Sequence, residues 1–270
     1  MKELTNGIAL YDLKNTNSRE AYYFAEYLFG RLNIQPNSAY YYYEHEADRH
    51  GETVSEKEVS FAELEEEIEK GIDHFRVFFS STNRLWDVGF SFFGKESKFS
   101  EGMSYIEIQF SNKILSTTNS EVLDCLYDFL KGNEMIYGIG YQLYANVSAA
   151  LNYALCLDAS TIYPFEDSNE WLYQLPSRSG EEPQYYHKLR MVYPINILNK
   201  DHLELSVMGI KLSKWILSDS NNGTLKPLNG FNYLWLVSMQ ELERINEVLG
   251  KSSLLISWES INKSIRNKLP

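Results

Sequence analysis

Three short segments in the first half of the chain have apolar residues at every second position. They span 74–80, 87–93 and 104–110, and Phe75 and Val77 are examples from the first. This period of two is typical of β-strands. The polar links between the segments are too short to hold the crossover helices that parallel strands require. The sequence therefore predicts an antiparallel meander and excludes a doubly wound parallel fold.

Helical spacing of apolar residues appears between and around these strands. Residues 20–32 carry one apolar face, and Ser60 with Glu63 forms a capping box before a stripe that ends at Gly71. The same signals predict helices over 120–132, 148–157, 238–250 (with a capping box at Ser238–Glu241) and from Ser257 onward. Further strands are predicted at 38–45, 135–146, 185–197, 231–237 and 252–256. We therefore expect an α+β fold, with a mixed or antiparallel sheet flanked by helices.

The interleaving of helices and strands predicts a single compact domain over residues 1–270. The stretch 159–184, which contains three prolines, reads as a long irregular connection and is the one internal boundary that the sequence suggests. A chain of 270 residues buries roughly three quarters of its unfolded surface, so it needs no disulfide or metal to fold. Cys125 and Cys156 both lie in apolar helical patterns and are expected to be buried.

The charge balance restricts the class of partner. There are 25 basic and 37 acidic residues, giving a net charge of −12, which repels nucleic acid and attracts a basic protein. The N-terminal residues have no apolar stretch typical of a signal peptide, and no apolar run approaches the ~18 residues of a membrane span. The sequence favours a cytoplasmic protein; a homodimer stays open.

No local motif indicates a catalytic, cofactor or metal site. His45 and His50 are five residues apart, whereas a zinc-protease helix needs four. Gly250-Lys251-Ser252 and Gly138-Ile139-Gly140 are only fragments of phosphate-binding and dinucleotide-binding motifs. His74, His187 and His202 occur singly, so ordinary hydrogen-bonded or surface histidines are favoured over catalytic bases. We predict no catalytic residues, no cofactor and no metal.

Acidic residues concentrate between positions 44 and 70, where eleven acidic residues face three basic ones. This local charge of −8 is either a solvated surface or an electrostatic landing site for a basic protein. Tyr40–Tyr43 lead into it, and a strand would turn two of these tyrosines toward the core and two away from it. The partner-binding residues predicted here are Tyr41, Tyr43, Glu44, Glu46, Asp48, Glu52, Glu56, Glu63, Glu66 and Glu67.

The order and spacing of elements in the second half resemble a known family. The segments that carry the resemblance are Met191–Leu198, Asp201–Leu203, Gly209–Ile216, Trp235–Val237, Leu249–Gly250 and Leu254–Ile256. Over about residues 135–256 the chain resembles bacterial toxin-immunity proteins of the type VI secretion immunity family. The resemblance implies an α+β protein that neutralises a cognate toxin by stoichiometric binding, without catalysis.

Two other functions are compatible with the sequence. The first is a phage-encoded inhibitor of a host defence protein. The second is an enzyme whose site is assembled from scattered residues such as His187, His202 and the pair Glu181-Glu182. A deep pocket with converging titratable groups would favour the enzyme, whereas a flat acidic face with tyrosines would favour a binding protein.

Overall fold

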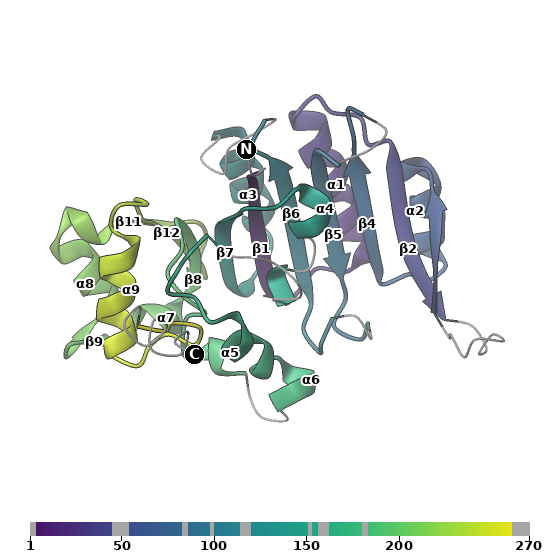
Figure 1. Ribbon diagram of the computed structural model, residues 1–270. Helices are drawn as coiled ribbons and strands as arrows, with labels where there is room; N and C mark the ends of the chain where they lie inside the picture. The colour runs from purple at the N-terminus through teal and green to yellow at the C-terminus, as the bar shows by residue number, and fades with distance from the viewer. Residues whose placement is uncertain are drawn as a thin grey trace, which may run out of the picture.

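One large antiparallel sheet runs through the whole chain (Figure 1). The computed structural model describes residues 4–44, 54–82, 86–97, 100–113, 120–150, 153–155, 162–179 and 183–260. The strands of the sheet are β1 (Thr5–Leu13), β2 (Ser38–Glu44), β3 (Val54–Val59), β4 (His74–Phe79), β5 (Val88–Phe93), β6 (Tyr105–Ser111), β7 (Met135–Leu143), β8 (Ile195–Asn199), β11 (Thr224–Pro227) and β12 (Asn232–Leu236). Their order is β11-β12-β8-β7-β1-β6-β5-β4-β2-β3. A separate two-stranded ribbon pairs β9 (Ser206–Val207) with β10 (Ile210–Lys211).

Three helices from the first half of the chain cover one face of the sheet, whereas the connection that follows β7 and the helices of the C-terminal part pack against the other (Figure 1). The described helices are α1 (Ser18–Arg31), α2 (Phe61–Glu69), α3 (Ser120–Leu130), α4 (Val147–Ala150), α5 (Ser168–Tyr173), α6 (Pro176–Ser179), α7 (Lys200–Leu203), α8 (Leu212–Ser218) and α9 (Leu242–Lys251). Short 3₁₀ turns are η1 (Tyr153–Leu155), η2 (Gln184–Tyr186) and η3 (Ser220–Asn222). The predicted α+β fold and the meander β4-β5-β6 are confirmed.

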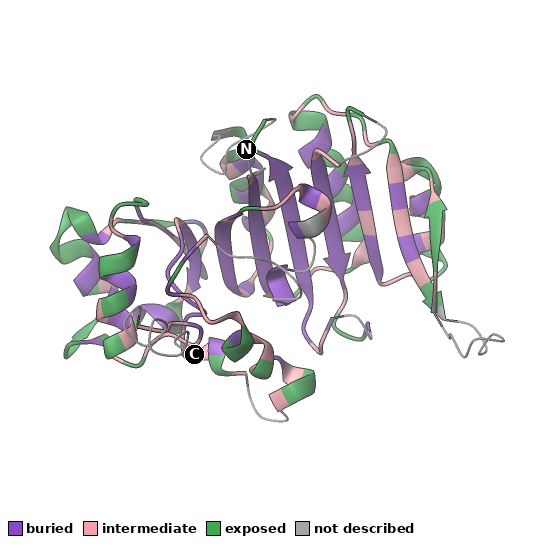
Figure 2. Cartoon of the chain, in the orientation of Figure 1, coloured by how far each residue is buried: buried purple, intermediate pink, exposed green. Residues whose placement is uncertain are grey.

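The two faces have separate apolar cores. We call the face packed against α1, α2 and α3 the helix face; Ile8, Leu10 and Phe90 belong to its core. We call the opposite face, to which Ala9 and Tyr11 contribute, the loop face. Strands β5 and β6, in the middle of the sheet, are buried along their whole length, while β2, near the edge, is only partly buried (Figure 2).

The central strand β1 was not predicted from the sequence. It pairs with both β6 and β7, and nearly all its residues are buried. A strand covered on both faces has no polar side to alternate with the apolar one, so the period of two disappears. The edge strand β3 was missed for the opposite reason, because its sequence is mostly charged and polar.

Several predicted elements in the second half are wrong or shorter than expected. The predicted strand 185–197 begins only at Ile195; before it come the turn η2 and a buried loop over residues 189–193, whose apolar residues resemble those of a strand. The predicted strand 252–256 contains only an isolated bridge from Leu255 to Leu189. The proline-rich connection contains α5 and α6.

Helix signals in this half were also misleading. The predicted capping box at Ser238 is a turn closed by the Glu241 backbone N–H, and α9 begins at Leu242. Of the predicted helix 148–157, the structure describes α4 and η1, and Cys156 lies outside the described residues. The predicted helix from Ser257 is wrong over residues 257–260, which are not helical and include a bridge from Trp258 to Glu166; the rest of the predicted helix lies outside the described residues. Cys125 is buried, as predicted.

Candidate interaction surface

The residues predicted to bind a partner do not form one patch. Glu46, Asp48 and Glu52 lie outside the described residues, as does the side chain of Glu44. Glu56 lies on β3 directly opposite Tyr42, so its side chain shares the loop face with that tyrosine. The other members, on β2 and α2, belong to the helix-face side of the sheet.

The alternation predicted for Tyr40–Tyr43 divides these tyrosines between the two faces. Tyr41 packs into the helix-face core, is only 4% exposed and donates its hydroxyl to Glu67 at 2.9 Å. Tyr41 is therefore a core residue with almost no contact area for a partner. Tyr43, two positions on, is 41% exposed. Tyr40 and Tyr42 lie on the loop face and are half-buried.

The acidic side chains of α2 have three different roles. Glu63 completes the capping box with Ser60, and the resulting hydrogen bonds lower the pKa of Glu63. Glu67 accepts hydrogen bonds from Tyr41 and Lys70, which lower its pKa, and also pairs with Lys57. Glu66 is exposed and has no hydrogen bond or ion pair within the described residues. Glu63 and Glu67 are therefore already engaged in hydrogen bonds of the fold, whereas Glu66 is not.

The three helices of the helix face together form a strongly acidic surface. We call α1, α2 and α3 the helix layer; α1 lies in the middle and contacts both neighbours. The layer contains ten acidic and two basic residues, a net charge of −8 out of −12 for the whole chain. The acidic surface inferred from residues 44–70 therefore extends over helices that lie far away in the sequence.

Exposed tyrosines lie among these acids. Tyr23 and Tyr27 on α1 and Tyr127 on α3 are 48%, 39% and 40% exposed. Tyr23 donates to Glu65 of α2 at 3.2 Å, and Tyr27 donates to Asp128 of α3 at 2.9 Å. An ion pair of 2.7 Å between Arg19 and Glu69 adds a second link from α1 to α2. These hydrogen bonds and the ion pair connect the three helices and limit side-chain motion before a partner binds.

The sequence contained a signal for these tyrosines that went unused. Each occupies a position that the apolar stripe of its own helix leaves facing outward, where a charged side chain is usual. A large aromatic residue at such a position is typical of contact surfaces. Weighing α1 and α3 by their polar faces as well as their apolar ones would have identified Tyr23, Tyr27 and Tyr127.

The loop face contains a concentrated group of polar side chains, but it is closed. Arg190 and Glu166 form an ion pair of 3.1 Å in which both side chains are fully buried. The Arg190 guanidinium lies 4.4 Å from the ring centre of Tyr153 and 5.2 Å from that of Trp171. Tyr153 and Tyr193 each donate a hydroxyl to Glu166. With no exposed atoms, this ion pair cannot meet a substrate, and its role is to fix the connection onto the sheet.

The scattered residues named for an enzyme are not brought together as a site. His202 is fully buried, with Nδ1 accepting from the Asn199 backbone and Nε2 within 2.8 Å of the Tyr185 carbonyl. Burial lowers the pKa of His202 to about 4. His187 is exposed, and Glu181 and Glu182 lie outside the described residues. His202 is therefore a structural residue of α7.

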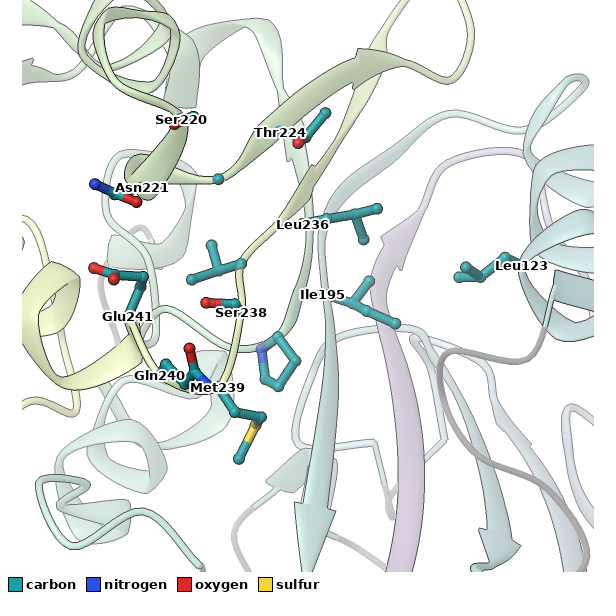
Figure 3. Close-up of a pocket in the computed structure, with 13 residues that line it drawn as sticks. Leu123, Ile195, Ser220, Asn221, Thr224, Leu236, Ser238, Met239, Gln240 and Glu241 are labelled. Carbon is teal, nitrogen blue, oxygen red and sulfur yellow. The ribbon is translucent and has the colours of Figure 1, made fainter.

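A pocket of about 600 Å³ lies beside the edge hairpin β11–β12 (Figure 3). Its floor is apolar, with Ile195 and Leu236, and its walls carry neutral polar side chains such as Ser238 and Thr224. The charged group in its lining is Glu241, which pairs with Arg244 at 2.6 Å. The pocket therefore does not have the converging titratable groups that an enzyme site would need.

The described residues contain neither a grouped set of metal ligands nor a membrane-spanning helix. Within them, no three His, Cys, Asp or Glu side chains are grouped so as to hold a metal ion. No helix in the described part of the chain is long and apolar enough to span a membrane.

Comparison with known proteins finds a solved structure with a similar fold. No protein-family model and no curated protein matches the sequence. Among solved structures, the chain is similar to PA0821, a type VI secretion system protein of Pseudomonas aeruginosa. The TM-score is 0.57 at 13% identity, over 96% of this chain and 74% of that one. The two chains share a fold, which confirms the predicted type VI resemblance at that level.

A second match is to the toxic C-terminal tip of CdiA from Pseudomonas aeruginosa in complex with immune protein. It has 14% identity and covers 52% of this chain and 86% of the other. Its TM-score of 0.25 is too low to indicate a shared fold.

Proposed function

We propose that this chain is a cytoplasmic immunity protein that neutralises a cognate bacterial toxin by stoichiometric binding, without catalysis. The observation that carries the proposal is the helix layer, where a charge of −8 coincides with three exposed tyrosines, two of which are hydrogen-bonded to neighbouring helices. The fold shared with a type VI secretion protein supports the same reading.

The chemistry of the layer fits a basic protein partner. Clustered carboxylates accelerate the encounter with a positively charged surface and orient it, an effect that depends on salt. Exposed tyrosines then supply rigid amphipathic contact area at low conformational-entropy cost. An inhibitor that must capture its toxin before damage occurs needs both a high on-rate and a specific contact.

The edges of the sheet are poor alternatives for the interface. The edge strand β3 carries Glu56, Lys57 and Glu58, and the opposite edge strand β11 carries Lys226 and Pro227. Charges and proline on an edge strand disfavour the addition of a strand from another chain. This favours binding across a face of the molecule.

The proposal is tested by reversing charge in the layer without disturbing its internal bonds. Glu26, Glu66 and Asp124 are exposed and have no hydrogen bond or ion pair within the described residues. Replacing all three with Lys changes the charge by six units. The partner is an inactivated form of the toxin-domain protein encoded beside this chain's gene, and the readout is its on-rate across a salt series. We expect a loss of roughly tenfold or more at low salt, and much less at high salt.

A matched control separates the layer from overall charge. Glu96, Glu170 and Glu243 are also exposed, lie outside the layer and give the same six-unit change when replaced with Lys. We expect this variant to lose much less on-rate than the layer variant. Equal losses would show that the layer is only part of a general negative field, and unchanged binding in both variants would place the interface elsewhere. If the neighbouring product is no toxin and does not bind, the immunity function itself is wrong.

A further inference from the structure

A shallow slot lies between α1 and α3 on the outer surface of the helix layer. It measures about 500 Å³ and is lined by Glu20, Tyr23, Phe24, Tyr27, Asp128, Phe129, Gly132 and Asn133. The rings of Phe24 and Phe129 stack at 3.9 Å between centroids, with an angle of 9° between their planes. An apolar stacked pair therefore lies between tyrosine rings and carboxylates.

From this lining we infer that the slot binds an arginine side chain of the protein partner. The inference rests on the proposed function and names the group that the acidic layer would recognise. An arginine has an aliphatic stem that packs on apolar surface, and a planar guanidinium that stacks on aromatic rings and bonds carboxylates. The aromatic pair and the tyrosines supply the apolar and ring surfaces, and the carboxylates in the lining are those of Asp128 and of Glu20, which also accepts from the Asn17 backbone N–H.

The chain's own cations already make contacts of this kind around the slot. Arg31 donates to the Tyr27 hydroxyl at 2.9 Å, and its guanidinium carbon lies 5.8 Å from the centre of the Tyr27 ring. Directly after α3, Lys131 pairs with Asp128 at 2.7 Å. Tyr27 and Asp128, which line the slot, therefore each already contact a cationic side chain. A partner's arginine would add to or replace contacts that the fold has already made.

The slot favours arginine over lysine because of its shape. An ammonium group is a compact, strongly hydrated charge that gains little from a stacked aromatic floor. A guanidinium is more weakly hydrated and can stack on a tyrosine ring while its N–H groups reach a carboxylate. The carboxylate Oδ2 of Asp128 lies 2.9 Å from the Tyr27 hydroxyl, so ring and carboxylate are close enough for one guanidinium.

A matched pair of tyrosines tests the slot. Tyr27 lines it, whereas Tyr127 is equally exposed on the same acidic layer but is not part of the lining. The probe is a fluorescein-labelled peptide of four Gly-Arg repeats, with its uncharged citrulline counterpart, measured by fluorescence anisotropy at low ionic strength. We expect Tyr27→Leu to weaken binding of the arginine peptide at least fivefold, and Tyr127→Leu to weaken it less than twofold. Tyr27→Phe, which keeps the ring, is expected to stay within twofold of the wild type.

Three outcomes would overturn the inference: equal losses in Tyr27→Leu and Tyr127→Leu, equal binding of the citrulline peptide, or equal binding of a matching lysine peptide. Tyr23→Leu, on the same slot, provides a second variant if Tyr27→Leu folds poorly by circular dichroism. Arginine selectivity at the slot together with no toxin binding would leave the slot standing and reject the immunity function. If the slot variants bind the toxin as well as the wild type does, the slot inference is wrong and the immunity function stands.

Discussion

The two faces of the sheet differ in where their polar chemistry lies. On the loop face, Arg190, Glu166 and the surrounding tyrosines satisfy one another with no exposed atoms in the ion pair. On the helix face the core is apolar, and the carboxylates and tyrosines lie on the outside of the helices. The buried polar group of the loop face therefore stabilises the fold, whereas the exposed carboxylates and tyrosines of the helix layer are accessible to a partner. In this molecule, solvent exposure distinguishes these two groups of polar side chains better than residue type does.

Breaking the buried ion pair is expected to have the largest effect on the free energy of unfolding. Arg190→Met leaves the Glu166 carboxylate buried without its cation, which costs about 3–5 kcal/mol. Adding Glu166→Gln removes the uncompensated charge, so the double variant is expected to recover part of that loss. Both are measured by urea denaturation at pH 7.

The control for this prediction is Arg31→Met on the helix layer. Arg31 is exposed, and we expect its replacement to change stability by no more than about 0.5 kcal/mol. If Arg190→Met cost no more than Arg31→Met, the contrast between a structural loop face and an accessible helix layer would fail.

The next largest effect is a pH dependence that originates on the loop-face side. The folded pKa of His202 is about 4, below its ordinary value of 6.5, because burial disfavours the charged ring. Between these two values the unfolded chain binds a proton that the folded chain does not, so stability falls as the pH is lowered through this range. The expected loss is on the order of 3 kcal/mol between pH 7 and pH 4.

The variant His202→Gln isolates this contribution. Glutamine is accepted at the third position of a capping box, so α7 can keep its start while the titrating group is lost. We expect the urea-denaturation difference between pH 7 and pH 4 to shrink by a similar amount relative to the wild type. His187→Gln, at an exposed site, serves as the control, and equal shifts in the two variants would contradict the assignment.

The sequence predicted the parts of the fold in which polar and apolar residues alternate with a regular period. Strands β4, β5 and β6 belong to the predicted meander, and α2 was identified from its capping box. In the central strand β1 the run Ile8–Tyr11 is wholly apolar, so no alternation is visible, whereas residues 189–193 are buried without forming a strand. Alternation therefore failed in both directions.

The candidate surface was predicted in part for a similar reason. The acids of α2 are close together in the sequence, so their charge was visible, but the acids and tyrosines of α1 and α3 join them only through packing. The roles of Tyr41 and Glu67 depend on which strand face α2 covers, which a single sequence does not specify. The pair Arg190–Glu166 joins residues 24 positions apart with no local pattern to link them.

The smallest predicted effect separates two neighbouring acids of the helix layer. Glu67 is 17% exposed and accepts from Tyr41, whereas Glu66 is exposed. Hydrogen bonds from Tyr41 and Lys70 hold the folded pKa of Glu67 below its ordinary value of 4.5.

A depressed carboxyl pKa stabilises the fold at pH values above the unfolded pKa, and this stabilisation is lost as the pH falls through the folded pKa. We therefore expect Glu67→Gln to lower the free energy of unfolding at pH 7, because a bond to a neutral acceptor is weaker than one to a carboxylate. The cost should vanish well below pH 4.5, where the wild-type carboxyl is protonated as well. Glu66→Gln should change stability by less than about 0.5 kcal/mol at either pH. Urea denaturation of both variants at the two pH values measures the difference, and equal effects at pH 7 would mean that both acids belong to the open surface.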